Sequence, residues 1–359
     1  MQLRSSLGSD PFVAVVLVNW NSWRDCIECI DTVLAQQFSR FHIFVVDNAS
    51  QDHSVEQLQT WCASPSRSPT WRCHDGIDRW TTQSPGRAVF CVTITDAHEN
   101  SSAAYSDHSV TLIRSKSNLG FAGGCNLGIA MATLEVFDYF WLLNTDTVVH
   151  RDALHALVAR AQEDANIGMV GSTIRYYDRP DIIQAMGGAH LCPEKAVSWH
   201  LGEGCTLADV PDSVAAIERE MTFVFGASML VSRALIREVG MMTEDYFLYY
   251  EEIDWAMRSR AKFKLGYAAN SHVYHKSGNS SAKVLPTFAA NYYYRNRLRF
   301  TSRFFPQFLG AAKRTLLMEL LRTAAKGQWS RTLLLARILL DANAIAVQAI
   351  DNFDSPTRR

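Results

Sequence analysis

Short apolar runs that stop at a polar residue constrain the fold of this chain more than any other feature. Three of them cover Phe12 to Val18, His42 to Val46 and Tyr139 to Leu143, and the residues that follow are Asn19, Asp47 and Asn144. Continuous β-branched runs of this length are typical of strands covered on both faces, as in parallel sheets. Apolar residues recur at helical spacing from Trp23 to Leu34. The β-α-β-α alternation therefore predicts an α/β fold with a mostly parallel, Rossmann-like sheet flanked by helices.

The later part of the chain continues this pattern and then becomes helical. We expect a helix over 152–162, strands over 168–174 and 223–232, and two short last strands over 266–269 and 272–275. From Phe304 onward the spacing is helical, which predicts a C-terminal helical extension. The expected division is an α/β domain over 1–300 and a helical region over 301–359. Residues 62–108 are rich in Ser, Thr, Pro, Asp and His, so we interpret them as an insertion with one strand-like stretch over 88–94.

Composition excludes some classes of function and leaves others open. The chain has 359 residues, is 48% hydrophobic and has a formal net charge of −1, so it can bury a large core and has no overall attraction to nucleic acid. Eight cysteines without a compact framework, and a start without a signal-peptide core, favour a reduced, cytoplasmic context. The Cys26-x-x-Cys29 pair falls on a predicted amphipathic helix and is weak evidence for a metal or redox site. The sequence contains no stretch of about 18 uninterrupted apolar residues, so it does not predict a membrane-spanning helix.

The polar strand ends indicate a ligand site. In open α/β sheets, ligands bind at the carboxyl ends of the strands. Asn144-Thr145-Asp146 and Asp47 lie at such ends. A divalent cation prefers one or two carboxylates together with phosphate oxygens, so Asp146 with Asn144 nearby fits a metal that holds a diphosphate. The alternative is that Asp146 only caps a turn, as Asx residues often do.

Seven segments, taken in order, resemble one enzyme family. They are "VVLVNWN", "VVDNAS", "NLGFAGGCNLGI", "WLLNTD", "GASMLVSR", "FLYYEEIDWAMR" and "VYHKSGNSS". This series is similar to the inverting GT-A glycosyltransferases of family 2, in the rhamnosyltransferase-like branch, over Phe12 to Arg299 apart from the insertion. The resemblance implies a GT-A fold and transfer of a hexose, such as rhamnose, from a dTDP- or UDP-linked donor. The implied acceptor is a glycan or lipid-linked glycan in polysaccharide biosynthesis.

The resemblance also implies a metal and donor site. Asp146 matches the main carboxylate of the motif that binds Mg²⁺ or Mn²⁺ with the diphosphate, and Asn144 stands at the motif's first position. His275 matches a residue that completes the metal shell or contacts the diphosphate, and we expect the following segment, with Ser277 and Ser281, to close over phosphate. The expected donor-binding residues are Asn19, Asp47, Asn118, Gly123, Asn144 and Arg295. Among these, Asp47 matches the residue that accepts a hydrogen bond from the pyrimidine ring.

The catalytic base is expected among the acidic residues Glu251, Glu252 and Asp254. An inverting transfer needs a base for the acceptor hydroxyl, and the family's base falls on Glu252, with Glu251 as the alternative. Glu stands here where the family usually has Asp. A simpler interpretation is that acidic residues favour a helix N-terminus, and that Asp254 pairs with Arg258 at i,i+4 spacing.

The region from Asn291 onward leaves several interpretations open. Arg295 can bind phosphate in a fork, either of the donor or of a lipid-linked acceptor, or its stem can simply cover apolar surface. The basic, apolar C-terminal helices fit peripheral contact with the inner face of a membrane, packing on the catalytic domain, or a homo-oligomer interface. Two other functions stay open: a nucleotidyltransferase, and a non-catalytic module that binds nucleotide sugars.

Overall fold

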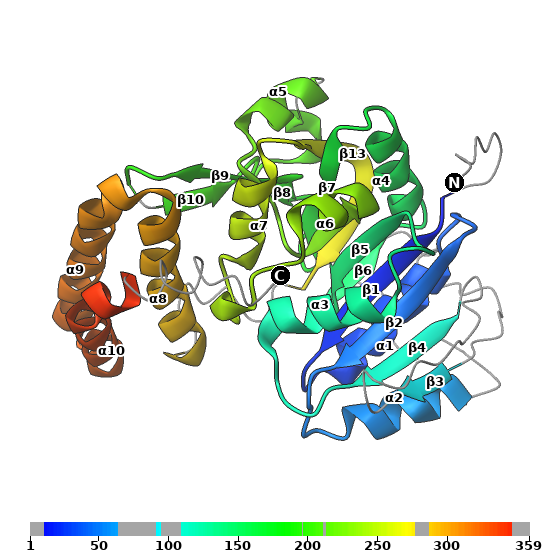
Figure 1. Cartoon of the computed structure of the whole chain (residues 1–359), viewed down its shortest axis with the longest axis horizontal. Coiled ribbons are helices and arrows are strands. Elements are labelled where there is room, and N and C mark those ends of the chain that lie inside the picture. Colours follow the sequence, from blue (N-terminus) through cyan, green and yellow to red (C-terminus); the bar gives the residue numbers. More distant parts are fainter. Residues whose placement is uncertain are drawn as a thin grey trace.

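The computed structural model describes residues 11–63, 91–94, 109–195, 197–210, 213–276 and 287–346. Within these residues, ten strands form one large sheet (Figure 1). They are β1 (Val13–Asn19), β2 (Phe41–Asp47), β3 (Cys91–Ile94), β4 (Val110–Arg114), β5 (Tyr139–Asn144), β6 (Thr147–Val149), β7 (Ile167–Tyr176), β8 (Ile183–Met186), β12 (Ser228–Ser232) and β13 (Lys264–His275). A smaller sheet contains β9 (Gly188–Cys192), β10 (Val197–His200) and β11 (Phe223–Val224).

The helices of the described residues flank the large sheet or follow it. They are α1 (Trp23–Leu34), α2 (Ser54–Ala63), α3 (Gly120–Met131), α4 (Ala153–Gln162), α5 (Val214–Glu220), α6 (Arg233–Val239), α7 (Glu251–Ser259), α8 (Thr287–Phe304), α9 (Leu309–Ala325) and α10 (Trp329–Leu340). The strand order is β3-β4-β2-β1-β5-β12-β7-β13-β6, with β8 paired to β7. Strands β3, β4, β2, β1 and β5 run parallel, whereas β12 runs antiparallel between β5 and β7. The predicted mostly parallel α/β sheet is confirmed.

Strand β1 shows why a continuous apolar run suits the centre of this sheet. Val13, Val15 and Leu17 belong to the core on one face, with residues of α1. Ala14 and Val16 belong to the core on the other face, with residues of α3. Because successive side chains of a strand point to opposite faces, a strand buried twice needs an apolar residue at every position.

Helix α3 begins earlier than the sequence indicates. From its sequence alone, the Gly-rich segment NLGFAGGC indicates a loop that leads into a helix, but the helix already starts at Gly120. A Cβ atom at Gly124 would lie 2.6 Å from Cγ1 of Val18, and one at Gly128 would lie 2.4 Å from Cγ1 of Val16. These glycines therefore let α3 pack directly on β1. The spacing that resembled a loop is the spacing of a helix–strand contact.

The two short last strands expected over 266–269 and 272–275 are one strand, β13. Its pairing with β7 shifts register between Ala268 and His272, so the strand bulges and continues. Beyond the bulge, β13 also pairs antiparallel with β6. Among the polar residues near the bulge, Ser271 is satisfied internally, since its Oγ lies 2.9 Å from Ser172 Oγ.

The expected insertion over 62–108 is described only in part. Helix α2 extends to Ala63, and β3 pairs parallel with β4 at the edge of the large sheet. The strand-like stretch expected over 88–94 is confirmed for 91–94. Residues 64–90 and 95–108 lie outside the described residues.

The C-terminal helices form a group of their own at one side of the molecule (Figure 1). Their shared core consists of Ala290, Tyr294, Leu298, Ala312, Leu316, Leu335, Ile338, Ala342 and Ile345. Helix α8 runs across residue 300, where we expected a domain boundary, and lies between the large sheet and the α9–α10 pair. That boundary stays a prediction. No helix of the described residues is both long and apolar enough to span a bilayer.

Candidate active site

Three of the expected donor residues lie on one edge of the large sheet. The register of β1 and β2 places Asn19 opposite Asp47, and the register of β1 and β5 places Val18 opposite Asn144. The carboxyl ends of these parallel strands therefore meet at the edge where ligands bind in open α/β sheets.

Asn19 and Asp47 form one buried polar cluster. Asn19 Nδ2 donates to Asp47 Oδ1 at 3.1 Å and to Ser50 Oγ at 3.2 Å. The backbone N–H of Ser50 donates to Asp47 Oδ2 at 3.2 Å. Asn19 Oδ1 is buried and has no hydrogen-bond partner among the described residues. A buried acceptor without a partner is costly, so a donor group of a ligand is a natural partner for it.

Asn48 links this cluster to α3, and sequence reasoning missed it. Its Nδ2 donates to Asn118 Oδ1 at 3.0 Å and to the Gly120 carbonyl at 2.9 Å, and its Oδ1 accepts from the Leu119 N–H at 2.9 Å. A Cβ at Gly123 would lie 2.7 Å from Cβ of Leu119. Asn118 is thus joined through Asn48 to the end of β2, and the donor-binding roles of Asn118 and Gly123 stay predictions. An Asn directly after Asp47 was the available signal.

Asp146 and His275 meet across the turn between β5 and β6. The antiparallel pairing of β13 with β6 places His275 opposite Thr147, and His275 Nε2 lies 3.3 Å from Asp146 Oδ1. Burial opposes the ionised form of Asp146, but the hydrogen bond and charge of His275 outweigh burial and lower the pKa of this carboxyl. Two residues that are 129 positions apart in the sequence are therefore brought together.

Gln184, which sequence reasoning did not identify, orients the His275 ring. Its Oε1 lies 2.9 Å from His275 Nδ1. Because an amide oxygen only accepts hydrogen bonds, Nδ1 donates to it, and Nε2 is the ring nitrogen that faces Asp146. A proton on Nε2 or a cation between Nε2 and the carboxylate can join the two side chains. Metal-binding histidines are oriented in this way by a second hydrogen bond, so the pair fits a divalent cation.

The described residues contain no group of three or more His, Cys, Asp or Glu side chains placed to hold a metal. The Asp146–His275 pair would supply two ligands, and a cation such as Mg²⁺ or Mn²⁺ takes its other ligands from phosphate and water. Asn144 precedes Asp146 by two positions, at the end of β5, and its backbone carbonyl accepts from Thr147 Oγ1 at 2.7 Å. This donor set fits a metal bound jointly with a diphosphate.

Glu251 and Glu252 begin α7, on the other side of the β11–β12 loop. A Cβ at Gly226 in that loop would lie 3.9 Å from Cδ of Glu252, and the Ala227 carbonyl accepts from the Asn144 N–H at 3.0 Å. Glu252 therefore lies near Gly226, Gly226 is bonded to Ala227, and Ala227 is hydrogen-bonded to Asn144 at the edge that carries Asp146. Burial raises the pKa of Glu252 to about 7. Burial, followed by the charge of Glu252, raises the pKa of Glu251 well above its usual range.

The two glutamates differ from Asp254, the third acid of the segment. Oε2 of Glu251 and Oε2 of Glu252 are buried without a hydrogen-bond partner among the described residues. Asp254 is fully buried and accepts from Thr243 Oγ1 at 2.9 Å, Tyr246 Oη at 3.1 Å and Arg258 Nε at 2.7 Å. Asp254 is thus occupied structurally, and its expected i,i+4 pair with Arg258 is confirmed.

The loop before α7 has an unusual backbone. Phe247, Tyr249 and Tyr250 all have positive φ, at 62°, 67° and 78°. Bulky residues rarely adopt this conformation, and it persists only where the surroundings enforce it. Here Asn296 of α8 donates its amide to the carbonyls of Tyr246, Leu248 and Tyr249, at 2.7, 2.8 and 3.0 Å. Asn296 therefore holds the loop that delivers the two glutamates.

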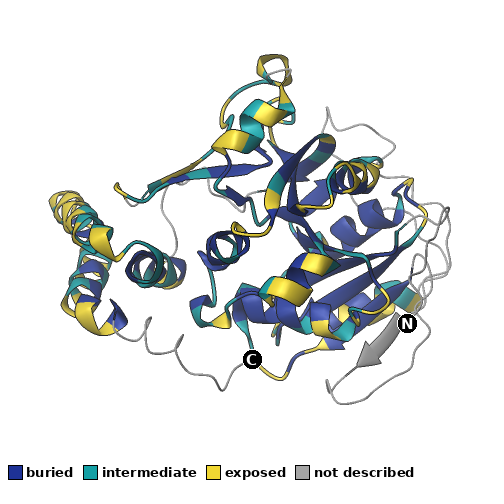
Figure 2. Ribbon diagram, turned by 45° about the horizontal axis from the view of Figure 1, so that its top comes forward, coloured by how far each residue is buried: buried dark blue, intermediate teal, exposed yellow. Residues whose placement is uncertain are grey.

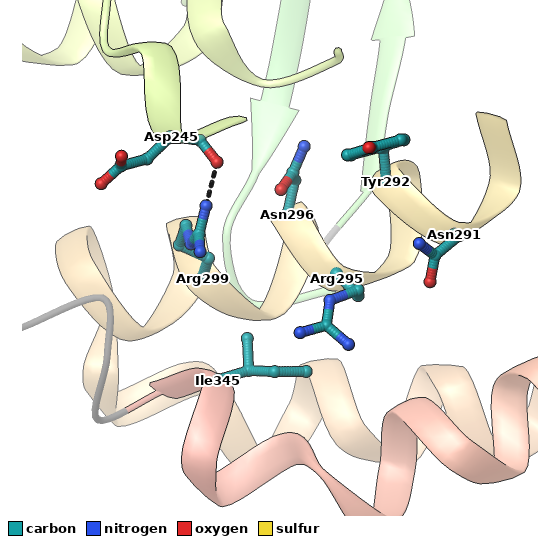
Figure 3. Close-up of a pocket in the computed structure, with 7 residues that line it drawn as sticks. All are labelled: Asp245, Asn291, Tyr292, Arg295, Asn296, Arg299 and Ile345. Carbon is teal, nitrogen blue, oxygen red and sulfur yellow. Dashed lines mark hydrogen bonds between the residues drawn. The ribbon is translucent and has the colours of Figure 1, made fainter. Parts of the chain in front are cut away.

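Arg295 lies on α8, away from the Asp146 turn. It lines a pocket of about 240 Å³ together with Asp245, Asn291, Tyr292, Asn296, Arg299 and Ile345. Figure 3 shows its side chain directed toward Ile345, whereas Arg299 donates to the Asp245 carbonyl. Arg295 Nη1 lies 3.9 Å from Asp341. Among the described contacts, none joins Arg295 to Asp146 or His275. Its role stays a prediction.

The other features singled out in the sequence are the Cys26–Cys29 pair and the segment that follows His275. Cys26 and Cys29 are buried in α1, and burial raises the pKa of Cys29 to about 12, which opposes thiolate chemistry. Lys276 follows His275 and donates to Asp25 and Glu28 of α1. The segment with Ser277 and Ser281, expected to close over phosphate, lies outside the described residues.

Comparison of the sequence with known proteins identifies relatives. The model of the family described as "Glycosyl transferase family 2" matches residues 14–72 and 91–203. A protein named low-salt glycan biosynthesis hexosyltransferase Agl10, from Haloferax volcanii, is 19% identical over 253 residues, covering 70% of this chain and 79% of that protein.

Comparison of the structure with solved structures confirms the fold class. The mannosyltransferase PcManGT from Pyrobaculum calidifontis, solved with GDP-Man and Mn²⁺, is similar with a TM-score of 0.50 at 15% identity, covering 96% of this chain and 87% of that chain. GalNAc-T7, solved with UDP, GalNAc and Mn²⁺, is similar with a TM-score of 0.51 at 14% identity over 83% of this chain. The chain spans about half of that protein, 49% of its length.

Proposed function

Because the chain belongs to glycosyl transferase family 2 and has the GT-A fold, we propose that it is an inverting, metal-dependent hexosyltransferase that uses a nucleotide-sugar donor. One observation carries this proposal. The same sheet edge holds an Asp146–His275 pair and, through the Gly226–Ala227 loop, Glu252. A cation-binding pair and a carboxylate with a raised pKa are the two groups that such a transfer needs.

Asp146 and His275 would hold Mg²⁺ or Mn²⁺. When bound, the cation neutralises charge on the departing nucleoside diphosphate. Gln184 keeps His275 Nε2 directed toward Asp146, and the Ala227 carbonyl fixes the backbone of Asn144. The proposed role of these residues is to hold the diphosphate at this edge of the sheet. Support for a metal comes from PcManGT, whose structure contains Mn²⁺.

The polar cluster at the ends of β1 and β2 would bind the nucleotide. Asn19 has a buried acceptor without a partner, and Asp47 lies beside it. We propose that this cluster accepts the ring N–H of a pyrimidine, as in a UDP- or dTDP-sugar, and that Asn118 and Gly123 line the same end. Rhamnose is the proposed sugar, because the sequence motifs resemble those of the rhamnosyltransferase-like branch.

Glu252 is the proposed base, and Glu251 is the alternative. The Glu252 carboxylate takes the proton of an acceptor hydroxyl, whose oxygen then bonds to the anomeric carbon as the bond from that carbon to the diphosphate breaks. A pKa near 7 suits this task, since the group is partly ionised at neutral pH and still binds a proton well. Glu251 is more deeply buried, and its pKa is raised further, which favours the protonated form.

The acceptor would be a glycan or a lipid-linked glycan. The pocket on α8 offers two guanidinium groups, from Arg295 and Arg299, and is large enough for phosphate groups. Arg295 therefore fits an acceptor phosphate better than the donor diphosphate, because the described contacts place it away from Asp146. A cytoplasmic location, as expected from the sequence, is part of this proposal.

The decisive experiment separates metal binding from proton transfer. Thermal shift with UDP-, dTDP- and GDP-sugars, with and without Mn²⁺, should reveal a donor that raises Tm only with the metal. Asp146→Asn should abolish that shift. Glu252→Gln should keep the shift and lower kcat by about 10²–10⁴-fold. Glu135→Gln, at an exposed carboxylate between α3 and β5 that pairs with Arg237, is the control and should change neither.

Four results would redirect the proposal. An unchanged metal-dependent shift in Asp146→Asn would remove the metal assignment. Near-normal turnover in Glu252→Gln, with loss in Glu251→Gln, would move the base to Glu251. Donor binding by the native protein without transfer or donor hydrolysis, even after a very long incubation, would favour a binding module, and release of pyrophosphate from a nucleoside triphosphate would favour a nucleotidyltransferase.

A further inference from the structure

Exposed apolar side chains concentrate on two helices. Among the described residues, eleven large hydrophobic side chains are exposed, and six of them lie on α9 and α10. These six are Leu317, Met318, Leu321, Trp329, Leu333 and Leu340, and we call them the hairpin face. Trp329, Leu333 and Leu340 are 66%, 70% and 86% exposed. A concentration of this kind marks an interaction surface, whereas single exposed apolar residues need no explanation.

The hairpin face is not a core left open by poor packing. Opposite sides of the same helices are buried: Leu316 of α9 packs with Leu335 and Ile338 of α10 and with residues of α8. The residues of α10 in the hairpin face recur at spacings of four and seven, which is one stripe of a helix. Figure 2 shows exposed residues on the outer sides of these helices. The two helices thus carry one apolar side inward and another outward.

The hairpin formed by α9 and α10 is also basic. Between Leu309 and Leu340 there are six basic residues and one acidic residue, a formal charge of +5 in a chain whose net charge is −1. Arg314, Arg322, Lys326 and Arg337 are exposed. Exposed cations beside an apolar stripe, with a Trp at the turn, are the features of helices that lie in a membrane interface.

We propose that the hairpin face lies on an anionic membrane surface, with the apolar residues in the headgroup region and the four exposed cations on lipid phosphates. A second copy of the chain is the rival occupant. A two-fold interface would place this strongly basic face against itself and would repel, whereas anionic lipid complements it. No helix of the described part of the chain is able to span the bilayer, so the contact is peripheral.

The proposal fits a lipid-linked acceptor but does not depend on it. Helix α8 belongs to the same helical core as α9 and α10, and Tyr292 of α8 stacks on Phe247, in the loop before the two glutamates, with ring centroids 4.7 Å apart. The active-site loop is therefore joined to the hairpin through one continuous helix. Vesicle binding needs no nucleotide sugar, so its failure and the failure of the proposed function are distinguishable.

The test is flotation of the full chain with vesicles, either of pure phosphatidylcholine or with phosphatidylglycerol added. We expect binding to the anionic vesicles, weaker binding to the neutral ones and a loss of binding at high salt. Leu321→Glu with Leu333→Glu should reduce binding at least tenfold. Arg322→Gln and Lys326→Gln should each reduce it about fivefold. Val136→Glu, at an exposed apolar residue of the sheet-bearing part, is the matched control and should bind like the native protein.

The variants are accepted only if their Tm stays within about 2 °C of the native value. Equal binding of the native protein and the Leu321→Glu, Leu333→Glu variant would overturn the proposal, as would no binding to anionic vesicles. Light scattering without lipid tests the rival occupant. A stable dimer that Leu333→Glu dissociates would show that a second copy covers the hairpin face, which would also overturn the proposal.

Discussion

Replacing Asn296 with Ala tests whether α8 positions the catalytic loop. Asn296 is buried, and its amide reaches three carbonyls of the loop, those of Tyr246, Leu248 and Tyr249. The loop backbone is strained, because three bulky residues between 247 and 250 have positive φ. Each such residue costs about 1 kcal/mol or more, so the loop has a tendency to relax once its restraint is removed.

The expected loss of stability follows from these contacts. The amide group has two hydrogens, so about two strong hydrogen bonds disappear. The Tyr246 carbonyl still accepts from the Leu248 N–H, whereas the carbonyls of Leu248 and Tyr249 lose this donor. Two bonds at about 1 kcal/mol each, with up to about 2 kcal/mol more for the carbonyls that lose their donor, give about 2–4 kcal/mol. A fall in Tm of about 4–10 °C corresponds to this range. A shift of about 1 Å in the glutamates should lower kcat up to about 100-fold.

Denaturant unfolding and single-turnover transfer assays measure the two effects. Asn126→Ala is the matched control, because Asn126 is a buried amide that donates to the Met242 carbonyl and accepts from its N–H, outside the strained residues. It should cost similar stability and retain most of kcat. The reasoning would be refuted if Asn296→Ala lost less than about 0.5 kcal/mol and kept kcat within twofold of the native value.

Two further predictions concern titration and backbone shape. Since burial raises the pKa of Glu252 to about 7, kcat should rise with pH up to about 7, as the base becomes ionised. The stability contributed by the protonated group should be lost as pH rises through its folded-state pKa. Measurements of kcat from pH 5 to 9 test the first expectation, and unfolding of the native protein and of Glu252→Gln over the same range tests the second. Gly120→Ala should destabilise by more than about 3 kcal/mol, because φ is +73° and a Cβ would lie 2.2 Å from the Phe247 carbonyl oxygen. Gly204→Ala, with φ +85° and open space around it, should cost only about 1–2 kcal/mol in the same unfolding assay.

The sheet and the residues at its edge could be predicted because their signal is local. A buried parallel strand is apolar at every position, so the first polar residue after the run marks the end of the strand. Asn19, Asp47 and Asn144 were found in this way, and the register of β1 places them together. This prediction needed no knowledge of the distances between these residues, because the carboxyl ends of parallel strands lie at one edge of the sheet.

The residues that orient the site could not be predicted, because their partners lie far away in the sequence. Gln184 contacts His275 from 91 positions away, and Asn296 contacts Tyr246 from 50 positions away. A lone amide on a strand or helix has no local pattern that separates it from a solvated residue. The glycines of α3 misled for a related reason, since close packing on β1 and close approach to a phosphate require the same absence of a side chain.

The bulge in β13 makes the number of residues matter more than their identity over a short stretch. Between Ala268 and His272 the strand contains three residues more than its partner β7, and only beyond them does it meet β6 and place His275 beside Asp146. Strand side chains alternate, so deletion of one residue here would turn His275 to the opposite side of the sheet. Natural relatives with the same Asp–His pair should therefore tolerate many substitutions in this stretch but conserve its length.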